Sequence, residues 1–269
     1  MPLDARFLAP RQKHMPGILG GLGPLSHVHF EQTLLSRNRL RGARADQQHP
    51  VWLLASASST PERTRALLSG GESALPYLFH FARLLEGAGA DALFVVCNTA
   101  HAYHAEVQKA IGIPWVHLMH ITATHIRESM PAGTAVGILG TSALLATRLY
   151  HRALEARELR PLAPEVGSAV QEKVVRAIFD PVVGIKATGA QITSESRSLL
   201  AEAADWCVEQ GARAVVAACT EVSAGLSPDA FSRARFVDPL VVAADIALDL
   251  AYGVRQPSEF LVSDATRQP

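Results

Sequence analysis

The chain has 269 residues; 25 Lys and Arg balance 25 Asp and Glu, 48% of the residues are apolar and 19% are charged. This length allows two α/β domains of ordinary size, each with a sizeable core. The composition excludes a disordered chain and a basic nucleic-acid-binding surface, so the expected partner is a small molecule.

The sequence favours a cytoplasmic protein that binds neither nucleic acid nor membrane. The opening MPLDARFLAPRQKH carries charges throughout, unlike a secretory signal, and residues 1–15 are expected to form a loose arm. No window supplies eighteen uncharged apolar residues, because the best one is interrupted by Asp245 and Asp249. Three cysteines fit a reducing compartment and no disulfide framework.

Short apolar strands alternate with amphipathic helices along the whole chain. The predicted strands are residues 16–21, 51–55, 92–97, 113–118, 135–139 and 214–219. The predicted helices are residues 25–40, 72–89, a short one from Ala100, 119–130, 142–156, 193–210 and a last one after Pro239. Uniformly apolar strands between helices are typical of parallel sheets covered on both faces.

The sequence contains an internal repeat. GILGGLGPLSH from Gly17 resembles GILGTSALLAT from Gly137, and GADALFVVCNT resembles GARAVVAACTE, which places Cys97 and Cys219 at equivalent positions. A duplication of this kind predicts two pseudo-symmetric, doubly wound parallel-sheet domains with the active site in the cleft between them.

The repeat also predicts the domain boundaries. Residues 1–117 and 226–269 are expected to form the first domain, and residues 118–225 the second. The last helix has no evident counterpart and is expected to return to cover the first domain. Since ligands of open α/β sheets bind at the carboxyl ends of the strands, Cys97 and Cys219 are expected on opposite walls of the cleft.

Two facing thiols suit the inversion of a carbon acid. A thiolate removes a proton from one face while a thiol donates a proton to the other face, and the two groups exchange roles with the direction of the reaction. Each cysteine precedes a predicted helix start. Backbone N–H groups there, with Asn98, Thr99 and Thr220, are suited to lower a thiol pKa and to hold a carboxylate. Cys97 and Cys219 are therefore the predicted catalytic residues.

The motif residues resemble a known family. CNTAH, which begins at Cys97, a later CTE, which begins at Cys219, and an earlier GGLGP are similar to motifs of the aspartate/glutamate racemase superfamily, and CTE resembles its aspartate racemase branch. The resemblance runs from about Pro16 to Tyr252. It implies a homodimeric racemase of an acidic amino acid that acts through the two cysteines without pyridoxal phosphate, metal or other cofactor.

The resemblance also implies which residues hold the substrate. TPERT places Arg63 where the family has its substrate-holding arginine, and Lys186 in GIKATG resembles the family's lysine. These two cations would pair with the distal carboxylate of an acidic amino acid. Asn98, Thr99 and Thr220 would receive its α-carboxylate and α-amino end.

Three further residues are expected to support the site. Gly23 in the glycine motif would let the backbone approach a small ligand or a helix. Glu221 would orient Thr220 or a nearby donor, or cap the following turn. His101 would tune the Cys97 thiol or serve in capping and packing.

Other interpretations match the sequence less well. The glycine motif departs from G-x-G-x-x-G at Ser26, which disfavours a nicotinamide cofactor. Histidine pairs such as His101 and His104 are spaced to share a metal, but no H-E-x-x-H motif joins them and no metal is expected. Cys207 lies within a predicted helix and is expected to be a core residue.

The sequence leaves alternatives open for the substrate and for the type of reaction. Leu22, Ser26-His27 and Ala57-Ser58 depart from the family's usual residues near the substrate end. Aspartate is the first candidate, then glutamate, then another acid such as a sulfonate analogue. One alternative is the same fold acting on another acidic carbon acid as an isomerase or decarboxylase, although a decarboxylase of this type needs one thiol. The other is a non-catalytic protein that binds an acidic ligand.

Overall fold

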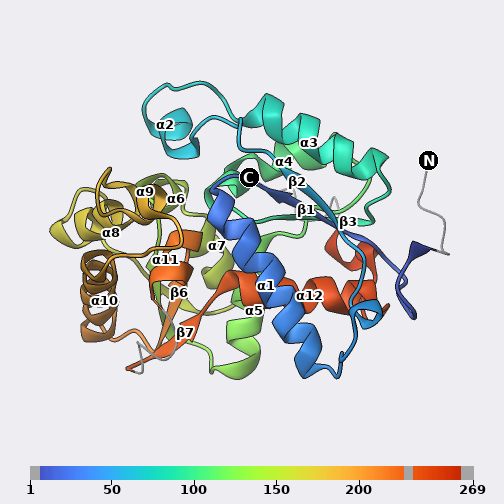
Figure 1. Ribbon diagram of the computed structural model, residues 1–269. Coiled ribbons are helices and arrows are strands. Elements are labelled where there is room, and N and C mark those ends of the chain that lie inside the picture. Colours follow the sequence, from blue (N-terminus) through green and yellow to red (C-terminus); the bar gives the residue numbers. More distant parts are fainter. Residues whose placement is uncertain (1–6, 227–232, 262–269) are drawn as a thin grey trace.

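The computed structural model describes residues 7–226 and 233–261, and its strands form two parallel sheets (Figure 1). The first sheet has the order β2-β1-β3, with β1 (Pro16–Gly20), β2 (Leu53–Ser56) and β3 (Ala92–Val95). The second has the order β5-β4-β6-β7, with β4 (Ala135–Leu139), β5 (Arg160–Leu162), β6 (Ala214–Ala217) and β7 (Arg235–Val237). Every strand pair is parallel, so the predicted α/β fold class is confirmed.

Helices connect the strands in both halves of the chain. In the first half they are α1 (Pro24–Leu40), α2 (Arg63–Leu68), α3 (Leu75–Gly87), α4 (His104–Gln108) and α5 (Leu118–Ser129). In the second half they are α6 (Ser142–Thr147), α7 (Leu149–Glu155), α8 (Ala169–Phe179), α9 (Ile185–Thr188), α10 (Ser194–Glu209), α11 (Thr220–Gly225) and α12 (Pro239–Ala251). The short 3-10 helices η2 (Asp46–Gln48), η3 (Thr99–Tyr103) and η5 (Pro257–Phe260) complete the set. Within the described residues, no helix has the length and apolar character needed to cross a membrane.

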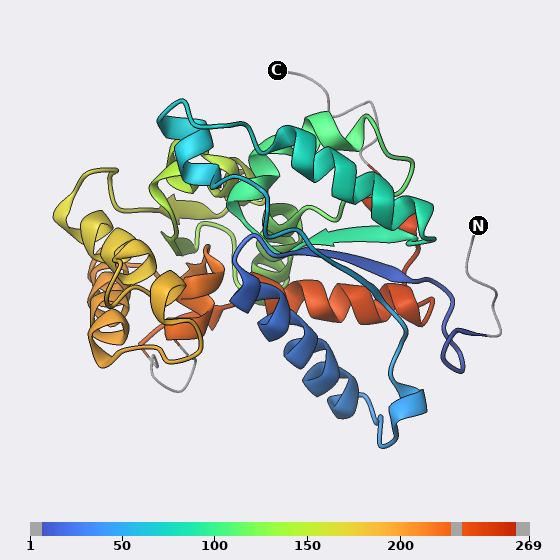
Figure 2. The same ribbon diagram turned by 45° about the horizontal axis from the view of Figure 1, so that its top comes forward.

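Successive residues of each strand pack into different cores. Ile18 of β1 and Val216 of β6 face a core that the two sheets share, whereas Leu19 and Val215 face cores beneath outer helices. Because side chains alternate across a strand, each sheet buries both of its faces. Figure 2 shows α3 on one face of the first sheet and α1 and α12 on the other.

The last helix does have a counterpart in the repeat, contrary to the sequence prediction. α5 follows a parallel bridge between Leu93 and Trp115, and α12 follows β7, which pairs in parallel with β6. Their first residues, Leu118 and Pro239, are 121 positions apart, in step with the rest of the repeat. α12 packs against α1 of the first half, and α5 packs against α7 of the second half. The halves therefore exchange their final helices.

Three predictions from the sequence are wrong: one domain boundary, one strand and one helix. Residues 235–237 form β7 in the second sheet, although the sequence assigns 226–269 to the first domain. The predicted strand at 113–118 makes only a single bridge. The predicted helix at 142–156 is divided into α6 and α7, because Arg148 adopts a left-handed conformation with φ 54° and ψ 22°.

The segment before β1 is not loose over its described part. Gln12 is buried, and its side-chain amide exchanges two hydrogen bonds of 2.7 Å with the backbone of Val51. Met15 is also buried, and its N–H donates to Asp91. Residues 1–6 of the predicted arm lie outside the described residues.

The break between α6 and α7 generates a stability prediction. A side chain at positive φ costs about 1 kcal/mol relative to glycine, which lacks the Cβ that clashes in this region. We expect Arg148→Gly to unfold at higher urea concentration than Arg148→Ala, by about 1 kcal/mol of unfolding free energy. Both variants lose the exposed 3.5 Å ion pair with Glu155, so the comparison isolates the backbone. Equal stability of the two variants would show that the left-handed turn carries no strain.

Candidate active site

The two sheets bring the predicted site residues together in one pocket between the halves. Cys97 lies two residues beyond the end of β3, and Cys219 two residues beyond the end of β6. The pocket is lined by Leu22, Glu62, Arg63, Cys97, Asn98, Thr99, Thr141, Phe179, Lys186, Cys219, Thr220 and Glu221. All predicted site residues except Gly23 and His101 are in this lining.

The pocket is closed. Its cavity volume is about 20 Å³, little more than the space that one water molecule requires. Cys97 and Cys219 are 9% and 7% exposed, so both thiols are shielded from bulk solvent. An amino acid can therefore reach the thiols only if the walls of the pocket, which come from the two halves, move apart.

Glu221 is the centre of the polar contacts on the second wall. Its carboxylate accepts hydrogen bonds from Cys219 Sγ at 2.9 Å, from Thr220 Oγ1 at 3.1 Å and from Lys186 Nζ at 2.6 Å. A Cβ atom at Gly23 would lie 2.9 Å from Glu221 Oε1 and 3.2 Å from Lys186 Nζ. Glycine at this position thus leaves room for the ion pair, which is how the glycine motif serves the pocket.

Burial and charge set the protonation of this cluster. Burial and the Glu221 carboxylate raise the pKa of the Cys219 thiol well above its ordinary value. Burial alone would raise the pKa of Glu221 too, but the Lys186 charge and hydrogen bonds from Cys219 and Lys186 hold it below its ordinary value. Burial acts to lower the pKa of Lys186, but Glu221 outweighs it and raises that pKa. At neutral pH the wall therefore holds a protonated Cys219 beside a charged Glu221–Lys186 pair.

Two hydrogen bonds join the halves across the pocket. Tyr150 of α7 donates its phenolic O–H to Asn98 Oδ1 at 2.8 Å, and the hydroxyl oxygens of Thr99 and Thr141 lie 3.0 Å apart. Neither Tyr150 nor Thr141 was predicted from the sequence. Aligning GILGG with GILGT, in the two halves of the repeat, would have drawn attention to Thr141. Tyr150 left no such signal, because its role depends on how α7 is oriented.

Arg63 is held by the backbone of its own wall. Nη1 donates to the carbonyls of Thr60 at 3.2 Å and Pro61 at 3.0 Å, and Nη2 donates to the carbonyl of Leu22. Its Nε atom is buried and has no hydrogen-bond partner among the described residues. Arg63 thus contributes a fixed positive charge to the pocket and one unused N–H group.

His101 lies behind the Cys97 strand end rather than against the thiol. Its Nε2 atom accepts the indole N–H of Trp115 at 3.0 Å and the N–H of Leu118 at 3.2 Å. The proton is therefore on Nδ1, which donates to the carbonyl of Cys97 at 2.9 Å. Burial and the neighbouring His104 lower the pKa of His101 to about 3, so the ring is neutral. Its contact with Cys97 is through the backbone, unlike the thiol contact that the sequence suggested.

His27 fixes the glycine turn that faces this wall. Its Nδ1 atom accepts the N–H of Gly21 at 3.1 Å. A Cβ atom at Gly20 would lie 2.5 Å from the His27 Cβ atom, and Gly21 has a φ of 80°. These contacts explain why small residues precede Leu22 in the pocket wall.

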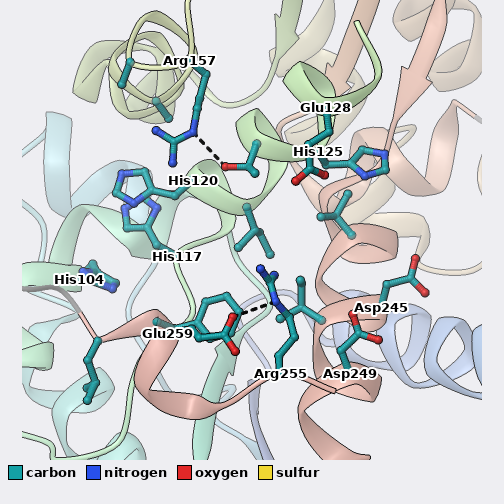
Figure 3. Close-up of a pocket in the computed structure, with 18 of the residues that line it drawn as sticks. His104, His117, His120, His125, Glu128, Arg157, Asp245, Asp249, Arg255 and Glu259 are labelled. Carbon is teal, nitrogen blue, oxygen red and sulfur yellow. Dashed lines mark hydrogen bonds and ion pairs between the residues drawn. The ribbon is translucent and has the colours of Figure 1, made fainter. Parts of the chain in front are cut away.

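A larger cavity of about 980 Å³ lies between α5, α7, α12 and η5, and no cysteine lines it (Figure 3). Its histidines are His104, His117, His120 and His125. Burial is the main cause that lowers the pKa of each of them, and the rings of His117 and His120 stack at 4.0 Å. Over the described part of the chain, no group of three or more His, Cys, Asp and Glu side chains is arranged to hold a metal. We assign the candidate chemistry to the smaller pocket because both predicted catalytic thiols line it.

Comparisons with known proteins show which family and fold the chain shares. The sequence model of the Asp/Glu/Hydantoin racemase family matches residues 19–247. The broad specificity amino-acid racemase RacX of Bacillus subtilis is 27% identical over 223 residues, which cover 79% of this chain and 87% of that protein. The aspartate racemase structure of Picrophilus torridus matches with a TM-score of 0.72 at 22% identity, covering 92% of this chain and 98% of that one. Glutamate racemase RacE1 of Bacillus anthracis matches with a TM-score of 0.60 at 15% identity, covering 94% and 85%. At these identities the structural matches show a shared two-domain fold.

The buried neutral His101 makes stability depend on pH. Its pKa is about 3 in the folded chain, against about 6.5 when unfolded. Only the unfolded chain binds a proton between these values, so the stabilisation present above pH 6.5 is lost as the pH falls, by about 2 kcal/mol at pH 5. We expect the unfolding free energy of His101→Gln to fall less between pH 7 and pH 5 than that of the unmodified protein. The exposed His80→Gln serves as the control, and parallel curves for the protein and His101→Gln would contradict the prediction.

Proposed function

Because the chain belongs to the Asp/Glu/hydantoin racemase family, we propose that it is a cofactor-independent racemase of an acidic amino acid, with aspartate the first candidate and glutamate the next. The observation that carries this proposal is the pairing of Cys97 and Cys219. The two thiols come from equivalent positions of the repeat and line one closed pocket. Acid and base groups of the same kind on two walls suit a reaction whose substrate and product are mirror images.

The proposed step transfers one proton on each face of the substrate. The Cys97 thiolate forms an S–H bond with the α-proton as the Cα–H bond breaks, and the electron pair passes into the carboxylate as an enediolate. The Cys219 thiol then donates its proton to the opposite face of Cα and becomes a thiolate. We assign the resting thiol to Cys219 because burial and Glu221 raise its pKa. The reverse reaction uses the same groups in exchanged roles.

Glu221 and Lys186 prepare Cys219 for both roles. The hydrogen bond from Sγ to Glu221 holds the proton when Cys219 acts as the acid. The Lys186 charge interacts with both Cys219 and Cys97. This charge favours whichever cysteine is the thiolate, so the pair supports proton transfer in either direction.

The proposal assigns the binding of the substrate to the polar groups at the strand ends. In this proposal Asn98, Thr99 and Thr220 hold the α-carboxylate and α-amino end, with the N–H groups of the helix starts that follow the cysteines. Arg63 and Lys186 face the distal carboxylate. Developing negative charge on the enediolate would then meet donors that are already fixed in the walls.

A broader amino-acid racemase is the second candidate. Among the charged lining residues, Arg63 and Lys186 are balanced by Glu62 and Glu221. Lys186 is paired with Glu221, and Arg63 with backbone carbonyls, so a distal carboxylate would have to compete for both cations. The similarity to a racemase named for its broad specificity supports the same candidate. Homodimerisation and a cytoplasmic location stay predictions from the family resemblance and the sequence.

The first test is proton NMR of the purified, reduced protein with L-aspartate and with L-glutamate in D₂O. We expect loss of the α-proton signal without added cofactor. If two bases act, deuterium appears first in the product enantiomer, and the remaining substrate keeps its α-proton. One cysteine takes the α-proton from the substrate, whereas the other cysteine, whose thiol has exchanged with D₂O, donates deuterium to the opposite face. Cys97→Ala and Cys219→Ala should each lower turnover by about 10²- to 10⁴-fold.

Cys207→Ala is the matched control for these variants, because Cys207 is buried in α10 away from the pocket. It should keep the activity of the unmodified protein. Equal early deuteration of substrate and product would instead indicate a single base. Binding of aspartate by calorimetry without any exchange would favour the non-catalytic alternative.

A second test separates the two substrate classes. L-Aspartate and L-asparagine have nearly the same shape and differ in the charge of the distal group. If Arg63 and Lys186 hold the distal carboxylate, charge-assisted hydrogen bonds should favour aspartate in kcat/KM by about 100-fold. We expect this preference from the acidic-substrate proposal. A ratio near one would support the broader candidate in its place.

A further inference from the structure

The oxygen atom of the Asn98 side-chain amide is held by a hydrogen bond. This Oδ1 atom accepts the O–H of Tyr150 at 2.8 Å, and the two residues are 3% and 1% exposed. They are 52 positions apart in the sequence and belong to different halves of the repeat. The bond therefore fixes a pocket residue of one half against a helix of the other half.

The opposite end of the same amide is unused. The Nδ2 atom of Asn98 is buried and has no hydrogen-bond partner among the residues that the structure describes. Asn98 lines the thiol pocket together with Cys97 and Cys219. A buried N–H donor without a partner is unfavourable, and a ligand with an acceptor at this point would supply the missing hydrogen bond.

The Nδ2 atom of Asn98 is a hydrogen-bond donor, and this determines which group of an amino acid can bind it. An amino acid at neutral pH offers an ammonium group, which has only donors, and a carboxylate, which has only acceptors. The Nδ2 atom of Asn98 can therefore pair with the carboxylate and not with the ammonium group. If the amide were reversed, its Oδ1 atom would face the pocket and repel the same carboxylate.

We propose that Tyr150 is a positioning residue that orients the Asn98 amide, so that Nδ2 faces the pocket and donates to the α-carboxylate of a bound amino acid. The identity of this acceptor rests on the proposed function; the orientation of the amide does not. The phenol is suited to the task because burial raises its pKa far above the ordinary value and keeps it a donor. Tyr150 is the second residue of α7, directly after the break at Arg148, so this break helps to direct the phenol towards Asn98.

Substitution of Tyr150 by Phe tests the proposal, because it removes the donor and keeps the ring that packs in the core. We expect Tyr150→Phe to raise KM and lower kcat/KM for L-aspartate by about 10-fold. Tyr252→Phe is the matched control. The Tyr252 phenol also donates to an asparagine Oδ1 atom, that of Asn38 at 3.1 Å, but away from the thiol pocket. It should leave KM and kcat unchanged.

A double-mutant cycle separates orientation from a general loss of packing. Asn98→Ala should lower kcat/KM by about 10- to 100-fold, and Tyr150→Phe should add nothing further in that background. Asn98→Asp keeps an acceptor for Tyr150 but presents an oxygen to the pocket, so it should reduce activity more than Asn98→Ala. Additive effects of Tyr150→Phe and Asn98→Ala would overturn the proposal.

A measurement without turnover keeps this proposal distinct from the racemase proposal. In protein labelled with ¹⁵N-asparagine, the Asn98 side-chain amide should give a single pair of N–H signals that shifts or broadens in Tyr150→Phe and stays unchanged in Tyr252→Phe. Unchanged signals in Tyr150→Phe would overturn the orienting role, whatever the enzyme activity. A changed amide signal in a protein that exchanges no α-proton would keep the orienting role and reject the proposed reaction.

Discussion

The pocket depends on one buried carboxylate. Glu221 has three donors around it: the Cys219 thiol, the Thr220 hydroxyl and the Lys186 ammonium group. An ionised carboxylate out of water is stable only when such partners compensate its charge. The same contacts determine that Cys219 is protonated and that Lys186 is charged. The acidity of one thiol and the charge of the pocket therefore have a common physical origin.

The duplicated architecture explains why the site lies between the halves. The parallel strands of each half end towards the same pocket, and each half contributes one cysteine from the strand beside its first strand. In the exchange of α5 and α12, α12 of the second half contacts α1 and β1 of the first half, and α5 of the first half contacts α7 of the second half. The two halves also share one hydrophobic core.

The repeat supports its two cysteine segments in different ways. Four residues after Cys97, His101 links the strand end to the N–H of Leu118 at the start of α5. Four residues after Cys219, Ser223 donates to Asp238 at 2.9 Å, and Asp238 accepts the N–H of Leu240 at the start of α12. In both halves a side chain one turn after the cysteine is tied to the exchanged helix. The first half uses the neutral imidazole of His101, and the second half uses the hydroxyl of Ser223 with the carboxylate of Asp238. The two halves therefore share the link between strand end and helix start, although the residues that form it differ.

The fold class, the repeat and the two thiols could be predicted from the sequence, because strand hydrophobicity and the position of a residue at a strand end are local properties. The sequence also brought Arg63, Lys186 and Glu221 to attention through their motifs. The partners of these residues depend on the folded arrangement: Glu221 neutralises Lys186, backbone carbonyls hold Arg63, and His101 bonds to a carbonyl instead of a thiol. The contact of Tyr150 with Asn98 and the exchange of α5 and α12 were also invisible in the sequence. Each depends on how two distant segments are oriented in space, and periodicity within one segment carries no information about that orientation.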